Sequence, residues 1–107
     1  MKKNAASLVI GVFNRTGDFA ENKDVARQIR IEQVIPTLSS GKSIVIDFTN
    51  VSFTTQSFVH AMLSEALRQF GQKALDSMEF KACAPAVKSV IQTVVEYSLA
   101  ARETVSS

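Results

Sequence analysis

Three polar residues near the middle of the chain have the side-chain types of a hydrolytic site. Asp47 ends an apolar segment, and Ser57 and His60 stand three residues apart where the next periodic segment begins. Such residues can serve as a nucleophile, a general base and the carboxylate that orients the base. Ser57, however, lies between Gln56 and Phe58 and lacks the small neighbours of a catalytic serine. We therefore interpret these residues as polar residues beside a helix and predict no enzymatic activity.

Other residue types that carry chemistry are sparse. The chain has one histidine, His60, and one cysteine, Cys83, which excludes a disulfide framework and a zinc site made of thiolates or several imidazoles. The triplet at 41–43, Gly-Lys-Ser, is similar to the end of a phosphate-binding loop, but it precedes a predicted strand where such a loop must open a helix. We interpret the triplet as a turn. We expect neither a metal ion nor a cofactor.

Hydroxyl and amide side chains gather between Asp47 and the following helix. Free N–H groups and partial positive charge mark a helix N-terminus, so a hydroxyl there caps the helix, or holds or becomes a phosphate. Ligand sites in open α/β sheets also lie beyond the carboxyl ends of the strands. A cap and an anion or phosphorylation site are thus both open alternatives. The residues concerned are Thr49, Asn50, Ser52, Thr54, Thr55, Gln56 and Ser57.

The strands that position this cluster follow from hydropathy. Continuous apolar runs rich in β-branched residues at 8–13 and 44–48 predict strands covered on both faces. Residues 78–82 alternate between apolar and charged, which predicts an edge strand with one solvated face.

Three segments have helical spacing of their apolar residues. Residues 58–70 form an amphipathic helix that ends at Gly71, and a last helix begins at Pro85 with Tyr97 on its apolar arc. The segment 22–38 changes its apolar side partway, with Ile31 grouped with the later apolar residues. It also contains Pro36, which predicts a bent or two-part helix.

The order β-α-β-α-β-α predicts an α/β fold. We expect a single-layer, mixed or mostly parallel β-sheet with packed helices and right-handed crossovers. No linker-like segment interrupts the 107 residues, so residues 1–107 are predicted to form one domain.

Composition excludes several classes of protein. A net charge of +2 with 46% hydrophobic residues argues against a disordered chain. The sequence has no polybasic tract with interleaved aromatic residues, so nucleic-acid binding is not indicated. It also lacks a run of about 18 apolar residues, so a membrane span is not indicated. Lys2 and Lys3 imitate the start of a signal peptide, but no cleavage site follows. We expect a cytoplasmic protein.

The segment 44–58, IVIDFTNVSFTTQSF, resembles the signature of STAS domains, the sulfate-transporter and anti-sigma-factor-antagonist family, and in particular its bacterial STAS-like branch of unknown function. The order of elements is similar over most of the chain. In anti-sigma-factor antagonists the strand leads to an aspartate, two serines and a glycine, and a partner kinase phosphorylates the second serine. These four positions fall on Thr55, Gln56, Ser57 and Phe58, so only the phosphorylated serine is kept.

The resemblance implies a non-enzymatic regulatory module that binds another protein, commonly an ATP-binding kinase or ATPase-like regulator. Binding would use residues 49–57 and the following helix, and phosphorylation of Ser57 would switch it. Loss of the motif aspartate implies altered recognition by a kinase. Two alternatives stay open, a site for a nucleotide or other anionic small molecule at the same helix N-terminus and a homodimer through edge strands or helix faces. The implied partner surface is the exposed side of that helix, His60, Ala61, Ser64, Glu65 and Arg68.

Overall fold

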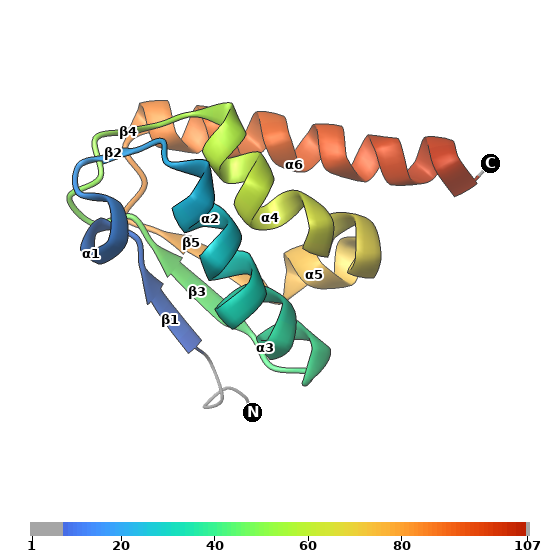
Figure 1. Cartoon of the computed structure of the whole chain (residues 1–107). Helices are drawn as coiled ribbons and strands as arrows, with labels where there is room; N and C mark the ends of the chain where they lie inside the picture. Colours follow the sequence, from blue (N-terminus) through green and yellow to red (C-terminus); the bar gives the residue numbers. More distant parts are fainter. Residues whose placement is uncertain (1–7, 107) are drawn as a thin grey trace.

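Three parallel strands form the main sheet of the computed structural model, which describes residues 8–106 and the side chains up to residue 100 (Figure 1). They are β1 (Leu8–Gly11), β3 (Ile44–Asp47) and β5 (Met78–Lys81), in the spatial order β1-β3-β5. Ile46 of the central strand pairs with Ile10 on one side and with Phe80 on the other. The three predicted strands and the α/β class are confirmed, with β3 in the centre and β5 at an edge.

The longer helices cover one face of this sheet (Figure 1). Ile10, Ile44 and Ile46 are buried beneath them. On the other face Val9 is 59% exposed, and Glu79 is exposed too. The prediction that strands 8–13 and 44–48 are covered on both faces is therefore wrong. Because the strand order advances in one direction, right-handed crossovers place each connecting helix on the same face.

The first crossover is a continuous helical segment with a change of winding. It consists of α2 (Lys23–Ile29), the π-helical segment η1 (Arg30–Val34) and α3 (Ile35–Ser39). This arrangement confirms the predicted two-part helix and places the irregular turn just before Pro36. Because Pro36 has no amide hydrogen and its ring crowds the carbonyl four residues earlier, the regular α-helical bonding cannot continue through it.

The π-helical turn also sets which side chains reach the core. Ile29 and Val34 are both fully buried although they are five residues apart. A π-helix spans about five residues per hydrogen-bonded turn, so the extra residue brings Val34 back to the buried side. Ile31 lies within this turn and is 56% exposed, so its predicted grouping with Val34 is wrong.

The triplet at 41–43 is a turn, as predicted. Gly41 has φ +80°, its amide donates to the Leu38 carbonyl at 3.0 Å, and the Lys42 amide donates to the Thr37 carbonyl at 3.1 Å. These two bonds form the Schellman motif that ends many helices, with glycine in the left-handed conformation. The turn leads directly into β3.

The remaining helices pack around α4 (Gln56–Phe70). It lies against α2 on one side and against α6 (Pro85–Ser106) on the other, while α5 (Gln72–Asp76) leads into β5 (Figure 1). α6 begins at Pro85, as predicted. The fully buried residues of α4 form the centre of the core, and they are Phe58, Val59, Met62, Leu63, Ala66 and Leu67.

A second, smaller sheet was not predicted. β2 (Phe19–Ala20) pairs in parallel with β4 (Phe53–Thr54), and the short helix α1 (Phe13–Thr16) precedes β2. Phe13 therefore belongs to a helix and not to the first strand. We call the β2–β4 pair the clasp, because it joins the two loops that leave the carboxyl ends of β1 and β3.

Candidate functional site

The candidate site begins with a tight turn after β3. Both the amide and the hydroxyl of Thr49 donate to Oδ1 of Asp47, at 2.9 and 2.6 Å. Asn50 has φ +69°, and the amide of Val51 donates to the carbonyl of Phe48 at 2.9 Å. Phe48 and Val51 are buried on either side of the exposed Thr49 and Asn50. Asp47, Thr49 and Asn50 therefore shape the turn.

Hydrogen bonding in this turn shifts the ionisation of Asp47. The hydroxyl of Thr49 contributes most to lowering the pKa of the Asp47 carboxyl below its ordinary value of 3.8, followed by the Thr49 amide. Partial burial opposes this shift, and the positive charge of Lys81 adds slightly to it. The carboxylate is thus ionised and held by Thr49.

We expect Thr49→Ala to raise the pKa of Asp47 toward 3.8, because it removes the hydroxyl that contributes most to the shift. A carboxyl whose pKa is lower in the folded state adds stability above the unfolded value, and this stability is lost as the pH falls through the folded pKa. Wild type should therefore exceed the variant in stability at neutral pH and match it in strong acid. NMR titration of Asp47 measures the shift, with Thr49→Ser as the control. An unchanged pKa in Thr49→Ala would refute this account of the turn.

The clasp fixes the chain between this turn and α4. The amides of Ser52 and Phe53 donate to the Asp18 carbonyl at 2.7 and 3.3 Å. Thr54 is fully buried, and its hydroxyl donates to the Ala20 carbonyl at 2.8 Å. The rings of Phe19 and Phe53 lie 5.4 Å apart on the outside of the clasp. The Thr54 hydroxyl is therefore a structural group inside the protein.

Thr55 caps α4 and leaves Ser57 free of that role. The Thr55 hydroxyl accepts a hydrogen bond from the Phe58 amide at 3.1 Å, and the Thr55 carbonyl accepts from Val59 at 3.2 Å. Ser57 is the second residue of α4, and its side chain is exposed. From the sequence, each of these hydroxyls could either cap the helix or serve as an anion or phosphorylation site. The structure assigns the cap to Thr55 and leaves Ser57 accessible.

Ser57 and His60 lie in a surface hollow of about 400 Å³ with residues from two other helices. Lys23 comes from the first turn of α2, and Thr93 and Tyr97 come from one side of α6. We call this feature the Ser57 hollow; Gln56 and Val94 complete its lining. Its lining contains a lysine and a histidine but no carboxylate.

Sequence reasoning identified only the α4 part of the Ser57 hollow. Lys23 and Thr93 carry no local signal, because their neighbours in the hollow are distant in sequence. Tyr97 was expected on the apolar arc of the last helix, yet it is 71% exposed. That expectation is wrong because the arc is wider than the surface that α4 and the sheet can cover. Ser98, the next residue, is buried instead.

The geometry gives no support to a Ser-His-Asp triad. Asp47 is bonded to Thr49 and does not line the Ser57 hollow. Among the residues that the structure describes, no hydrogen bond joins Ser57 to His60, and no group of three metal-binding side chains occurs. Cys83 is half-buried, and this burial raises the pKa of its thiol above 9.0, which is typical of an unreactive cysteine.

The surface expected on α4 is only partly a surface. His60, Glu65 and Arg68 are exposed, and the last two form an ion pair at 3.5 Å. Ala61 is half-buried, and its carbonyl accepts a long bond from Arg30 at 3.5 Å.

Ser64 is 2% exposed, and its hydroxyl accepts a hydrogen bond from Ser98 of α6 at 3.3 Å. The expectation that Ser64 lies on the exposed side of α4 is therefore wrong. The helix α6 thus packs against a side of α4 that the hydropathy pattern of α4 predicts to be polar. A buried pair of serine hydroxyls satisfies its polar groups internally, which explains how a polar residue fits at this helix contact.

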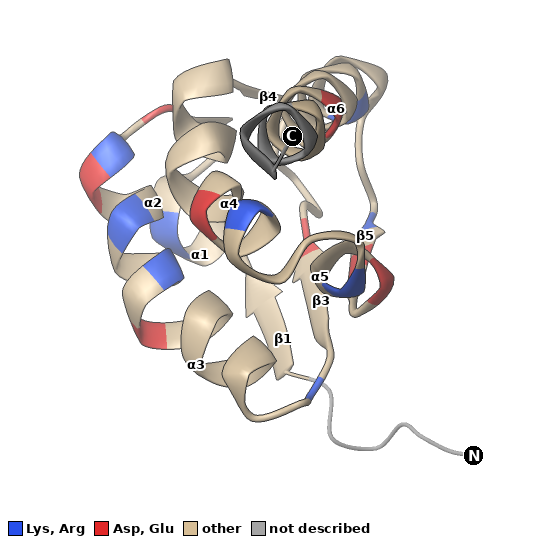
Figure 2. Cartoon of the chain, turned by 90° about the vertical axis from the view of Figure 1, so that its right-hand side faces the viewer, with Lys and Arg blue, Asp and Glu red and all other residues tan. Residues whose placement is uncertain are grey.

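Charges elsewhere on the described surface are mixed in sign. Figure 2 shows Lys and Arg interspersed with Asp and Glu along the helical segment from α2 to α3, where Asp24 and Arg27 form an ion pair at 3.0 Å. Within the described part of the chain, every helix is too short or too polar to cross a lipid bilayer.

Comparison with known proteins places this site in a family context. The family model described as "STAS-like domain of unknown function (DUF4325)" matches residues 25–88, more than half of the chain. The matched region contains the turn, β4 and all of α4, and it ends inside α6. No curated protein and no solved structure gives a significant match.

Proposed function

The chain belongs to the family of STAS-like domains of unknown function, and we propose on this basis that it is a non-enzymatic regulatory module that binds another protein. Binding involves residues 49–57 and the first turns of α4. The observation that carries the proposal is the Ser57 hollow, in which an exposed serine lies beside Lys23, His60 and Tyr97. Tyrosine is among the residues that contribute most to binding at protein interfaces.

Phosphorylation of Ser57 is the proposed switch. A phosphate there would add nearly two negative charges at the N-terminus of α4, where the helix dipole and Lys23 favour them. Because Thr55 provides the cap, modification of Ser57 leaves the fold intact. The added charge would repel an acidic partner. The partner class is an ATP-binding kinase or ATPase-like regulator.

The proposed contact surface differs from the one expected on α4 alone. It keeps His60, Glu65 and Arg68 and omits the buried Ser64. Thr93 and Tyr97 of α6 extend it across the Ser57 hollow. The proposed surface is therefore a composite of two helices.

A parallel capture experiment tests the switch. Wild-type protein, Ser57→Asp and Ser39→Asp serve as baits in lysate of the source cells, and mass spectrometry identifies what each retains. Ser39 is an exposed serine at the end of α3, so it controls for added charge. We expect a partner whose affinity falls by about tenfold or more with Ser57→Asp alone, since like charges in contact are costly. Equal capture by all three baits would remove the switch.

A second candidate ligand is a nucleotide or another anionic small molecule. The favouring observation is the lining of the Ser57 hollow, which offers Lys23 and three hydroxyls. Binding would raise the melting temperature with added nucleotide, and Ser57→Ala would reduce the shift. Thr55→Ala would not isolate ligand binding, because it also removes the N-cap of α4. No shift at millimolar nucleotide would eliminate this ligand class.

A further inference from the structure

Within the part of the chain that the structure describes, the outer edge of β5 has no strand paired with it. The carbonyls of Ser77 and Lys81 accept hydrogen bonds from the amides of Ile44 in β3 and of Phe48 just after β3, at 2.8 and 2.9 Å. Since backbone groups alternate in direction along a strand, those of Met78 and Phe80 point away from β3. Among the described residues, β5 pairs with β3 alone. This edge therefore presents a row of backbone donors and acceptors.

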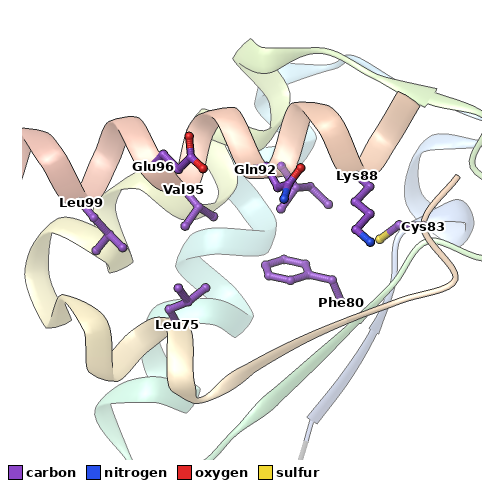
Figure 3. Close-up of a pocket in the computed structure, with 9 residues that line it drawn as sticks. Leu75, Phe80, Cys83, Lys88, Gln92, Val95, Glu96 and Leu99 are labelled. Carbon is purple, nitrogen blue, oxygen red and sulfur yellow. The ribbon is translucent and has the colours of Figure 1, made fainter. Parts of the chain in front are cut away.

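An apolar groove runs beside the same edge. It has a volume of about 560 Å³ and lies between β5, α5 and α6 (Figure 3). Phe80 is at its centre, beneath Gln92 of α6. A strand added to β5 would cover the groove as well as the backbone edge. The apolar lining residues are Leu75, Phe80, Ile91, Val95 and Leu99.

Charges on β5 are self-complementary in one register. Glu79 and Lys81 are exposed on the uncovered face of the sheet and flank Phe80. Two antiparallel copies of β5 can pair about Glu79, Phe80 or Lys81 if their helices stay on the same face. Pairing about Glu79 or Lys81 sets like charges opposite each other. Pairing about Phe80 sets Glu79 opposite Lys81 of the other copy, twice.

The charged residues of α6 at the rim of the groove are also self-complementary. Lys88, Gln92 and Glu96 follow one another at four-residue spacing, and all three line the groove. A two-fold axis through Phe80 would reverse α6 in the second copy and set Lys88 toward Glu96 of that copy. In the view of Figure 3, Gln92, the middle residue of this row, lies above Phe80. Within the described residues, none of the four charged side chains on β5 and α6 forms an ion pair; these are Glu79, Lys81, Lys88 and Glu96.

We infer that two copies of this chain form a homodimer in which their β5 strands pair antiparallel about Phe80. The two three-stranded sheets then join into one continuous sheet. The two apolar grooves meet at the axis, with charge pairs on the uncovered sheet face and along α6. The partner at this edge is a second copy of the chain, because each charge pattern has opposite charges on the two sides of its central residue. An antiparallel second copy therefore places an acidic residue opposite a basic one in both patterns.

Charge reversal on β5 tests the dimer by sedimentation equilibrium. Wild type should sediment at twice 11.7 kDa. Glu79→Lys should weaken the dimer about tenfold, since two favourable cross-strand pairs become repulsive. Lys81→Glu should do the same. The double variant restores both pairs and should dimerise like wild type, and an equimolar mixture of the two single variants should form a heterodimer.

Glu32→Lys is the matched control, because Glu32 is an exposed acidic residue in η1, outside both the edge and the groove. It should leave the dimer unchanged. A wild-type monomer throughout the concentration range would overturn the inference. A dimer that is insensitive to both single reversals, or one that the double variant fails to restore while circular dichroism shows a native fold, would also overturn it.

Discussion

Phe58→Ala is expected to lower the free energy of unfolding by about 3–5 kcal/mol, as large-to-small substitutions of buried aromatic residues do. Phe58 is fully buried in the first turn of α4, directly after Ser57. Domains of this size have a total stability of about 5–15 kcal/mol, so the loss is a large part of it. Urea denaturation followed by circular dichroism measures the effect.

Phe58→Leu is the control for this prediction, because it keeps most of the buried volume and should cost less than about 1.5 kcal/mol. A loss below about 1 kcal/mol in Phe58→Ala would contradict the burial of this ring, since such cavities normally cost more. The position matters for function as well. Anti-sigma-factor antagonists have a glycine where this chain has Phe58. Here the residue after the candidate phosphorylation site anchors α4 in the core.

Thr54→Val is expected to lower the free energy of unfolding by about 1–2 kcal/mol, because it removes a buried hydrogen bond without changing the shape of the side chain. The lost bond is the one from the Thr54 hydroxyl to the Ala20 carbonyl at 2.8 Å. That carbonyl keeps the weaker bond from the Thr55 amide at 3.2 Å. Since both bonds hold the clasp, amide hydrogen exchange at residues 52–55 should accelerate.

Thr54→Ser separates the two properties of this side chain, because it keeps the hydroxyl and loses the methyl group. Slow exchange at residues 52–55 should persist in Thr54→Ser and be lost in Thr54→Val. The opposite order would show that methyl packing, and not the hydrogen bond, holds the clasp. Denaturation of both variants measures the two contributions to stability separately.

The two surfaces proposed for binding use different sides of α6. Thr93 and Tyr97 line the Ser57 hollow, whereas Lys88, Gln92 and Glu96 line the groove beside β5. A dimer formed along β5 would therefore leave both Ser57 hollows accessible. Regulation through Ser57 and self-association can be tested independently, since Ser57→Asp and Glu79→Lys change separate surfaces.

Local patterns in the sequence predicted the three strands of the main sheet and the long helices of this protein. The apolar runs at β1 and β3, the alternation at β5 and the helical spacing in α4 and α6 each depend on neighbouring residues, so the periods of strands and helices reveal them. The same local information placed a cluster of polar residues at the end of β3. It also identified the family, because the signature segment is contiguous.

Tertiary structure alone decided which faces are covered and which residues meet. The direction of the crossovers left one face of the sheet uncovered, and the packing of α6 against α4 buried Ser64 and exposed Tyr97. The clasp and the Ser57 hollow join segments distant in sequence, so no periodic pattern in the sequence predicts them. Periodicity reports that a side chain is apolar or polar. Only the arrangement of the neighbouring elements determines what that side chain contacts.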